Sequence, residues 1–226
     1  MNFHLKEEDT NRIYHGKINL FKPHLDRNLL MHIKHKYSLG KFILSVSDIY
    51  KYKNIFELVQ AFSLIKDKIN PHLKLVLIGK SFDVKYSKLV KEFILKMEIQ
   101  EKVIFLGHVP HKELPFLYAL CKVFIYPSTC ESFGMPLVEA MACGSPILSS
   151  CIEPMLEICQ NAAFYFDPFD PKDIAEKLLT VLKDEDLLRR LKQLSIKRAN
   201  YFSWEKTAKE TLNVNLQCKG ETCSPF

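Results

Sequence analysis

The stretch that decides the fold is YPSTCESFGMPLVEAMACGSPILSS, residues Tyr126 to Ser150. It begins in the apolar run Val123–Pro127 and ends in the apolar run Pro146–Ser149, with a helical pattern over Pro136–Cys143 between them. Proline suits the first position of a helix, and the glycine and proline that follow the pattern end it. This stretch therefore predicts a strand, a loop, a helix and a second strand, which is one βαβ unit.

The same alternation of short apolar and longer amphipathic runs continues through the chain from Lys41. Further strands are predicted at Phe42–Ser47, Leu73–Gly79, Val103–Leu106 and Ala162–Phe166. Further helices are predicted at Asn54–Lys68, Asp83–Met97, His111–Leu120 and Pro154–Gln160. The strand runs are apolar without alternation, as expected where helices cover both faces of a parallel sheet. The predicted fold is α/β, a doubly wound, Rossmann-like parallel sheet with ligands beyond the carboxyl ends of its strands.

The chain is expected to divide into three parts. Residues 1–40 form a connector with one short helix near Asp26–His35, and residues 41–202 form the Rossmann-like domain. Two charged amphipathic helices, broken near Lys183–Glu185, complete that domain. Residues 203–226 are expected to form a last helix from Ser203 to about Leu216, capped by its first serine, and a loose tail.

Composition excludes several classes of protein. The 226 residues are 47% hydrophobic and 26% charged, which is typical of a globular chain. No apolar run approaches the roughly 20 residues that cross a bilayer, and the first ten residues do not resemble a secretory signal, so we expect a cytoplasmic protein. The seven cysteines contain no CxxC pair, which favours reduced thiols over zinc or disulfides.

Net charge and glycine spacing limit the classes of ligand that the chain is expected to bind. The net charge of +6 suits an anionic ligand or an acidic membrane face, and equally a lysine-rich surface without a partner. No block of five like charges occurs, so nucleic acid is not expected as a partner. No glycines have the GxGxxG spacing, and Lys74 stands where a P-loop ending at Gly79 would need glycine.

The loop before the helix Pro136–Cys143 carries the expected chemistry. Free backbone N–H groups of Phe133, Gly134 and Met135 would hold an anion such as a phosphate at the helix start. Glu139 is placed in the first helical turn and Glu131 in the loop, so both carboxylates are expected to overlook one mouth. Either glutamate alone could merely favour the positive helix end, but two acceptors beside an anion site suit a polyhydroxylated ligand.

The segment ESFGMPLVE, Glu131 to Glu139, resembles the E-x7-E element of the retaining glycosyltransferases of family 4, which have the two-domain GT-B fold. The resemblance is to their C-terminal, donor-binding half and runs from about Ile13 to Leu212. The AMACGSP that follows also matches. Supporting pieces are Leu77–Gly79, Phe105–Val109, Tyr126–Ser128 and Phe202–Glu205.

The resemblance implies a site for a nucleotide diphosphate sugar. Glu139 would bind the ribose hydroxyls, and Glu131 would contact the transferred sugar. Lys53 would neutralise the diphosphate, while His108 and Val109 would lie near the base. The amides of Phe133, Gly134 and Met135 would also hold the donor. The family does not generally depend on a metal ion, and the resemblance implies no other cofactor.

One position departs from the family pattern. An arginine is expected five residues before Lys53, and Asp48 stands there. A carboxylate cannot replace a bidentate cation and repels phosphate. Either Lys51 or Lys80 compensates, or donor binding is weaker or differently arranged. Lys51 and Lys53 could equally be part of a solvated loop.

Ile13 to Phe21 resembles the link that follows the N-terminal domain of such enzymes. The chain is therefore expected to be a fragment or a split subunit, with an acceptor glycan or lipid bound by an N-terminal domain that it lacks. The family commonly works in polysaccharide or glycolipid assembly, which allows peripheral association with the inner face of a membrane. Two alternatives stay open: a nucleotide-sugar epimerase, and, given Asp48, a non-catalytic nucleotide-sugar-binding or partner-binding module.

Overall fold

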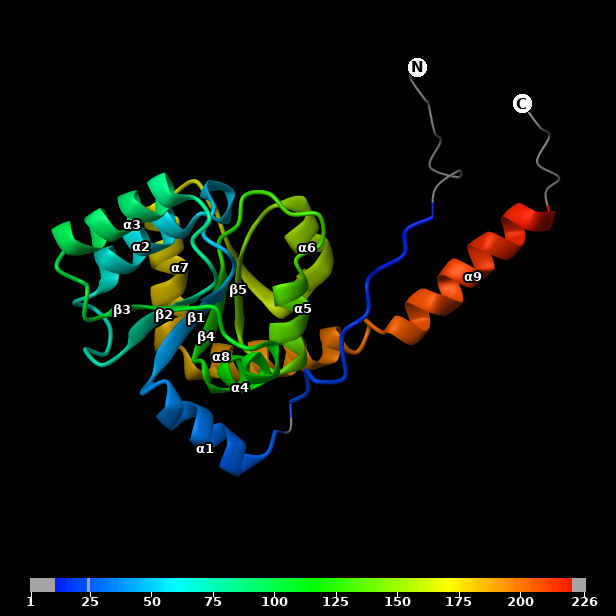
Figure 1. Cartoon of the computed structure of the whole chain (residues 1–226), viewed down its shortest axis with the longest axis horizontal. Coiled ribbons are helices and arrows are strands. Elements are labelled where there is room, and N and C mark those ends of the chain that lie inside the picture. The colour runs from blue at the N-terminus through cyan, green and yellow to red at the C-terminus, as the bar shows by residue number, and fades with distance from the viewer. Residues whose placement is uncertain (1–10, 24, 221–226) are drawn as a thin grey trace, which may run out of the picture.

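The computed structural model describes residues 11–23 and 25–220, and its centre is a six-stranded parallel sheet (Figure 1). The strand order is β3-β2-β1-β4-β5-β6, and every neighbouring pair is parallel. The predicted doubly wound α/β fold is confirmed. The strands are β1 (Phe42–Val46), β2 (Lys74–Ile78), β3 (Val103–Gly107), β4 (Val123–Tyr126), β5 (Ile147–Ser150) and β6 (Ala163–Phe166).

The predicted helices are present, with ends that differ by a few residues. Three of the connections between strands and helices contain single 3-10 turns, η2 (Lys51–Lys53), η3 (His111–Glu113) and η4 (Gln160–Ala162). The α-helices are α1 (Arg27–Lys36), α2 (Ile55–Ile65), α3 (Val84–Lys96), α4 (Leu114–Leu120), α5 (Met135–Ala142), α6 (Glu153–Cys159), α7 (Pro171–Lys183), α8 (Glu185–Ala199) and α9 (Trp204–Gly220).

Helices cover both faces of the sheet because neighbouring strand residues point in opposite directions. Phe42 and Leu44 of β1 pack into one apolar layer with α1, α4, α5 and α6. Ile43, between them, packs into the other layer with α2, α3 and α7. Helix α8 contributes to both layers. The apolar character of the strand runs is therefore explained by burial on both sides.

Carboxylates fix where several helices begin. The Asp83 side chain accepts from the Tyr86 N–H at 3.0 Å and caps α3. Asp184 accepts from the Leu187 N–H at 2.8 Å and caps α8 directly after α7 ends. The predicted break between these two helices is thus made by one capping aspartate.

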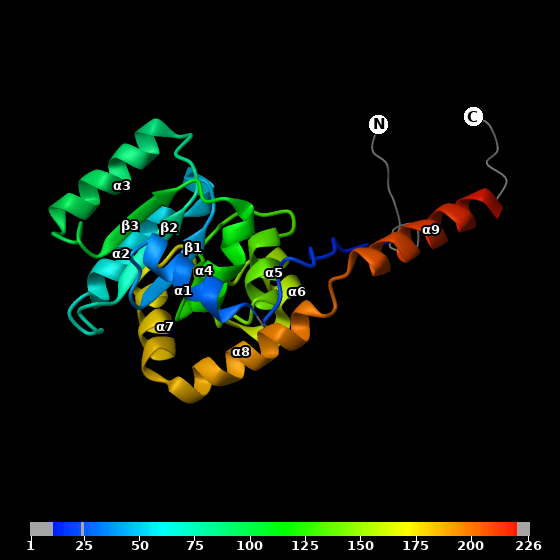
Figure 2. The same cartoon turned by 60° about the horizontal axis from the view of Figure 1, so that its bottom comes forward.

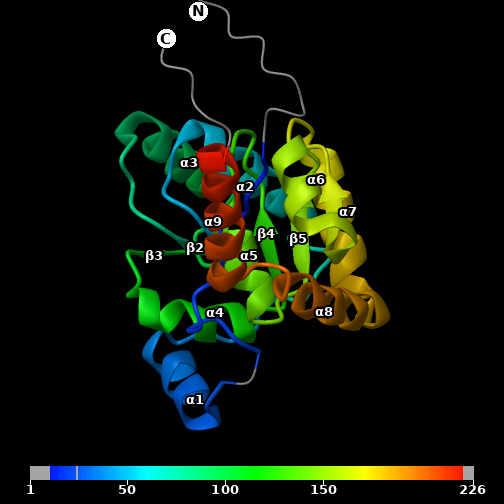
Figure 3. The ribbon, with the colours of Figure 1, turned by 90° about the vertical axis from the view of Figure 1, so that its right-hand side faces the viewer.

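The segment that precedes α1 lies beside the start of α9 (Figure 1, Figure 2 and Figure 3). The Lys17 N–H donates to the Phe202 carbonyl at 3.4 Å, and the Thr207 hydroxyl donates to the Tyr14 carbonyl at 2.6 Å. Helix α9 then extends away from the body and continues to Gly220, beyond the predicted end at Leu216.

Some of the sequence-based expectations fall on residues that the structure leaves out. The start of the predicted connector (1–10), position 24 and the end of the predicted tail (221–226) lie outside the described residues. Among the described cysteines, Cys121, Cys143 and Cys159 are buried and Cys130 and Cys151 are exposed, all as free thiols. Within 11–23 and 25–220, no helix is long and apolar enough to cross a bilayer.

Candidate functional site

The candidate site is a cavity of about 440 Å³ at the carboxyl edge of the sheet. Most of its lining comes from the segment that follows β1, from Ser47 to Lys53, and the segment that follows β4, from Glu131 to Pro136; Tyr126 and His15 complete it. Strands β1 and β4 are neighbours, and the strand order reverses between them. Such a reversal opens a crevice between two diverging loops, where ligands bind in open α/β sheets.

A buried charge cluster lies in this cavity. The Lys53 ammonium forms an ion pair with the Glu131 carboxylate, and their side chains are only 14% and 12% exposed. The Tyr126 hydroxyl donates to Glu131 at 2.7 Å and lies 3.4 Å from the Lys53 Nζ. Burial, followed by the negative charge of Glu131, raises the pKa of Tyr126, so this hydroxyl stays protonated and donates.

The start of α5 forms another wall. Gly134 precedes the helix with φ +87°, in the left-handed region that glycine occupies without strain. A Cβ at this position would lie 3.0 Å from the Met155 Cε, so the site is also tightly packed. Pro136 has no N–H, and the Leu137 N–H donates to the Gly134 carbonyl at 2.9 Å, so the backbone N–H groups left for a ligand are those at and just before the start of the helix. Phe133, Gly134 and Met135 all line the cavity, as the anion-site prediction requires.

The prediction that Glu139 and Glu131 overlook one mouth is wrong. Helix α5 begins at Met135, so Glu139 is its fifth residue and lies beyond the first turn. Glu131 lines the cavity, but Glu139 is not among the described residues that do so, and it is only 8% exposed. The cause is the direction of the helix face, which turns Glu139 toward α4 rather than toward the loop.

Two side chains hold the buried Glu139 carboxylate. The Tyr118 hydroxyl donates to Oε2 at 3.1 Å, and the His111 Nε2 lies 3.3 Å from Oε1. Burial raises the pKa of Glu139, while the hydrogen bonds from His111 and Tyr118 oppose that rise. Glu139 is thus a carboxylate whose desolvation is only partly compensated.

His111 connects Glu139 to a second cavity of about 230 Å³. This cavity is also lined by His108 and Val109, and it shares Ser47, Asp48 and Pro136 with the first cavity. The two cavities therefore adjoin along the carboxyl edge of the sheet. The structure brings the loop after β3 to the same edge as Lys53 and Glu131, which the predicted site requires.

The cations proposed to compensate for Asp48 lie at this edge of the sheet but do not line either cavity. Lys51 is exposed in η2, and Lys80 is exposed after β2; neither lines either cavity. Asp48 lines both cavities, and its Oδ1 accepts from the Lys80 backbone N–H at 2.7 Å. Among the described lining residues of the two cavities, Lys53 is the only lysine or arginine.

Sequence reasoning missed three residues of the site. Tyr126, Tyr118 and His111 are not among the site residues that the sequence predicts. Tyr118 is fully buried, and its hydroxyl donates to Glu139. A tyrosine inside an apolar helix needs a partner for its hydroxyl, and this was the signal available.

Solved structures with the same arrangement are glycosyltransferases. A glycosyltransferase from Rickettsia africae ESF-5 has a TM-score of 0.87 over 98% of this chain and 60% of that chain, at 21% identity. Anabaena Alr3699/HepE, solved in complex with UDP-glucose, has a TM-score of 0.80 over 95% of this chain and 58% of that chain, at 22% identity. The fold is one half of the GT-B fold of glycosyltransferases.

Curated relatives give the family. The serotype-specific mannosyltransferase WbdA of Escherichia coli is 34% identical over 177 residues, which is 78% of this chain and 22% of that protein. The O-antigen chain mannosyltransferase B of Escherichia coli is 31% identical over 163 residues, 72% of this chain and 42% of that protein. This chain thus spans less than half the length of these relatives. Residues 26–198 match the family described as Glycosyl transferases group 1, and the chain belongs to it.

Proposed function

We propose that this chain is the donor-binding half of a retaining glycosyltransferase, which takes a sugar from a nucleotide diphosphate sugar and passes it to an acceptor glycan or lipid. One observation carries the proposal: the cavity at the reversal of strand order brings Lys53, Glu131 and the start of α5 together. A cation, a carboxylate and free amides at one edge fit a ligand that has both phosphates and hydroxyls.

The diphosphate is assigned to Lys53 and to the amides of Phe133, Gly134 and Met135. During transfer the bond between the anomeric carbon and the diphosphate oxygen breaks, and negative charge grows on the departing diphosphate. A cation and a helix start already aimed at that position stabilise the growing charge without reorganisation. Glu131 is assigned to the transferred sugar, whose hydroxyls can donate to the carboxylate oxygens.

The nucleoside is assigned to the adjoining cavity. The backbone of His108 and Val109 would meet the base, and Glu139 would accept from the ribose hydroxyls. Because His111 contacts Glu139 and its side chain is 52% exposed, a ribose can take over this contact when the His111 ring turns toward solvent. Binding would thus offer the partly compensated carboxylate the hydrogen bonds that it lacks.

The relatives favour a particular use of this site. Two of them are named as mannosyltransferases, one of the O-antigen chain, and a solved structure of the same fold is a complex with UDP-glucose. A hexose from a nucleotide diphosphate hexose is therefore the proposed cargo, with mannose the first to test. The proposed role is polysaccharide or glycolipid assembly at the cytoplasmic face of a membrane. Acceptor binding would come from a second domain.

A second candidate function rests on Asp48. Its carboxylate borders both cavities and faces the place assigned to the diphosphate, where it disfavours an anion. A domain that keeps the architecture but binds the donor weakly would serve as a regulatory or partner-binding module.

Calorimetric titration separates the two functions. The full chain is titrated with UDP, GDP, ADP and dTDP sugars, and the titration is repeated with Glu139→Ala and with the control Glu176→Ala, which removes an exposed carboxylate of α7. Saturable binding that Glu139→Ala abolishes and Glu176→Ala leaves intact supports the donor site. Binding of no member of the panel, or equal binding by both variants, overturns it in favour of the module.

A further inference from the structure

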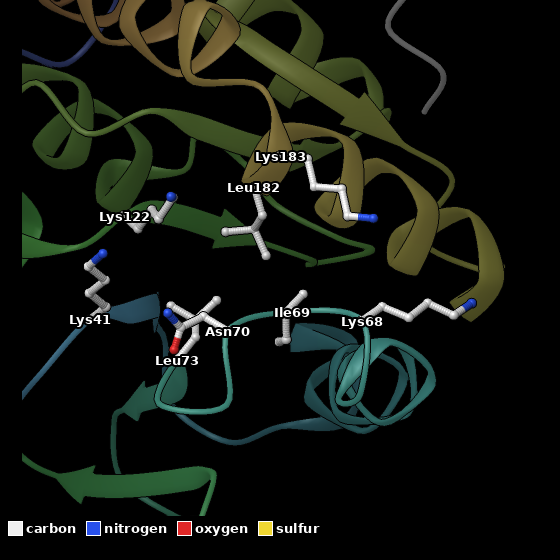
Figure 4. A pocket seen from close by; sticks show the side chains of 8 residues that line it. All are labelled: Lys41, Lys68, Ile69, Asn70, Leu73, Lys122, Leu182 and Lys183. Atoms are coloured by element: carbon white, nitrogen blue, oxygen red, sulfur yellow. The ribbon is translucent and has the colours of Figure 1, made fainter.

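A second charged site lies at the opposite edge of the sheet, where the strands begin. It is a hollow of about 140 Å³, lined by four lysines and by Ile69, Asn70, Leu73 and Leu182 (Figure 4). Lys41 immediately precedes β1 and Lys122 immediately precedes β4, while Lys68 follows α2 and Lys183 ends α7. None of these residues lines the candidate donor cavities.

The hollow concentrates positive charge. Four of its eight lining residues are lysines, and none is acidic. The Lys122 ammonium pairs with Glu185 at 2.8 Å, and this glutamate is 71% exposed and stands outside the lining. In the part of the chain that the structure describes, Lys41, Lys68 and Lys183 have no carboxylate within 4.0 Å of the ammonium nitrogen. Like charges gathered this way raise the electrostatic potential of the hollow.

Helix ends account for three of the four lysines of this cluster. Lys183 lies in the last turn of α7 and Lys68 lies just after α2, where a cation offsets the negative end of a helix. Lys122 likewise lies two residues after the end of α4, whereas Lys41 is five residues beyond the end of α1. The Lys122 N–H donates to the Phe42 carbonyl at 2.8 Å, and the Lys41 carbonyl accepts from the Lys74 N–H at 3.1 Å. The sheet therefore holds these two lysines side by side, and Figure 4 shows them at one end of the hollow.

We propose that this hollow binds a phosphate group, carried either by a small phosphorylated molecule or by an anionic phospholipid headgroup. Its volume is well below the roughly 300 Å³ at which cavities begin to enclose drug-sized ligands, so it suits one or two phosphates rather than a nucleotide sugar. Lys41 and Lys122 supply ammonium groups, and the Asn70 amide adds a neutral donor.

The sharpest test is a gain of binding. Since Glu185 competes with the ligand for Lys122, Glu185→Gln is expected to tighten binding of inorganic pyrophosphate about threefold. The readout is the movement of the Lys41, Asn70 and Lys122 amide signals in nuclear magnetic resonance, which separates this hollow from the Lys53 cavity. Glu92→Gln is the matched control, because Glu92 is an exposed partner of Lys88 on α3. Equal affinity of Glu185→Gln and wild type overturns the proposal.

A loss variant and two ligands complete the experiment. Lys41→Ala/Lys122→Ala is expected to weaken pyrophosphate binding about tenfold, whereas Lys88→Ala/Lys209→Ala, which removes two exposed lysines, leaves it unchanged. Phosphatidylcholine vesicles with and without phosphatidic acid form the second arm. Binding confined to pyrophosphate identifies a soluble ligand, and binding confined to phosphatidic acid identifies a membrane surface. Binding in neither arm, or equal binding by both double variants, overturns the site.

Discussion

The Lys53 ammonium and the Glu131 carboxylate form an ion pair although they are 78 positions apart in the sequence. The pair joins the loop after β1 to the loop after β4, on the two sides of the strand-order reversal. Both side chains are mostly buried, so each is the main neutralising partner of the other. The pair is thus both a structural link between two loops and the centre of the proposed donor site.

Breaking this pair from one side should destabilise the fold. Lys53→Met leaves Glu131 as a buried, unpaired carboxylate, and the free energy of unfolding in urea is expected to fall by about 3 kcal/mol. The double variant Lys53→Met/Glu131→Gln removes both charges and should recover most of that loss without recovering nucleotide-sugar binding. A single variant as stable as wild type would show that water already solvates the pair.

Glu139 should make stability depend on pH. Its pKa is raised above 4.5, so the folded state holds this proton more tightly than the unfolded chain does. The associated stability is present at low pH and is lost as pH rises from 4.5 through the raised value. Relative to wild type, Glu139→Gln should therefore gain stability as pH increases over this window, measured by urea unfolding at several pH values.

Glu113 provides the control of opposite sign. Hydrogen bonds from Lys36 and Tyr37 lower the pKa of Glu113 below 4.5. Its contribution is present above 4.5 and is lost as pH falls through the lowered value, so Glu113→Gln should lose stability relative to wild type as pH rises. Parallel pH profiles for Glu113→Gln and Glu139→Gln would contradict the roles given to these two carboxylates.

Asp48→Asn should strengthen donor binding. The asparagine Oδ1 can still accept from the Lys80 N–H, and the negative charge beside the proposed diphosphate is removed. We expect roughly fivefold tighter binding of the preferred nucleotide diphosphate, a gain of about 1 kcal/mol, by calorimetry. Asp67→Asn removes an exposed carboxylate after α2 and should change nothing. Weaker binding by Asp48→Asn would mean that Asp48 contacts the ligand favourably.

Gly79 should tolerate no side chain. It has φ +145°, and an added Cβ would lie 2.0 Å from the Ser47 carbonyl oxygen. Because this oxygen belongs to the backbone, it cannot move away without displacing the chain. Gly79→Ala is expected to lose on the order of 3 kcal/mol or more of stability. Gly40→Ala meets no atom within 4 Å and should stay within about 0.5 kcal/mol of wild type. Thermal unfolding followed by circular dichroism compares the two, and a matching fall in both would refute the steric cause.

Local sequence patterns predict the helices and strands, but not which of them lie side by side in space. The run around β4 and α5 predicts a strand, an anion-binding loop and a helix, because apolar runs, proline and glycine act over a few residues. The contact between Lys53 and Glu131 depends on β1 lying beside β4, and the strand order is set by packing of the whole sheet. No spacing of residues along the chain indicates that β1 lies beside β4, so the ion pair could not be predicted from local patterns.

Glu139 shows a second limit. Its place near the start of a helix was predictable, but whether it faced the loop or α4 depended on how α4 packs against α5. Tyr118 and His111, which hold Glu139, come from another helix and a 3-10 turn. The position of Glu139 in a helix was therefore predictable, whereas its burial depends on the packing of α4 and the 3-10 turn against α5.

The contacts of Lys17 with Phe202 and of Tyr14 with Thr207 bring the entrance and the exit of the folded body to one place. Because its two ends lie close together, such a domain can be inserted into a longer polypeptide or linked to another domain without the chain having to cross its sheet. The matching segments make up 22% of one relative and 42% of another, so similar segments occur in proteins of different size. This capacity for insertion follows from the closeness of the two ends and does not depend on the residues of the cavity.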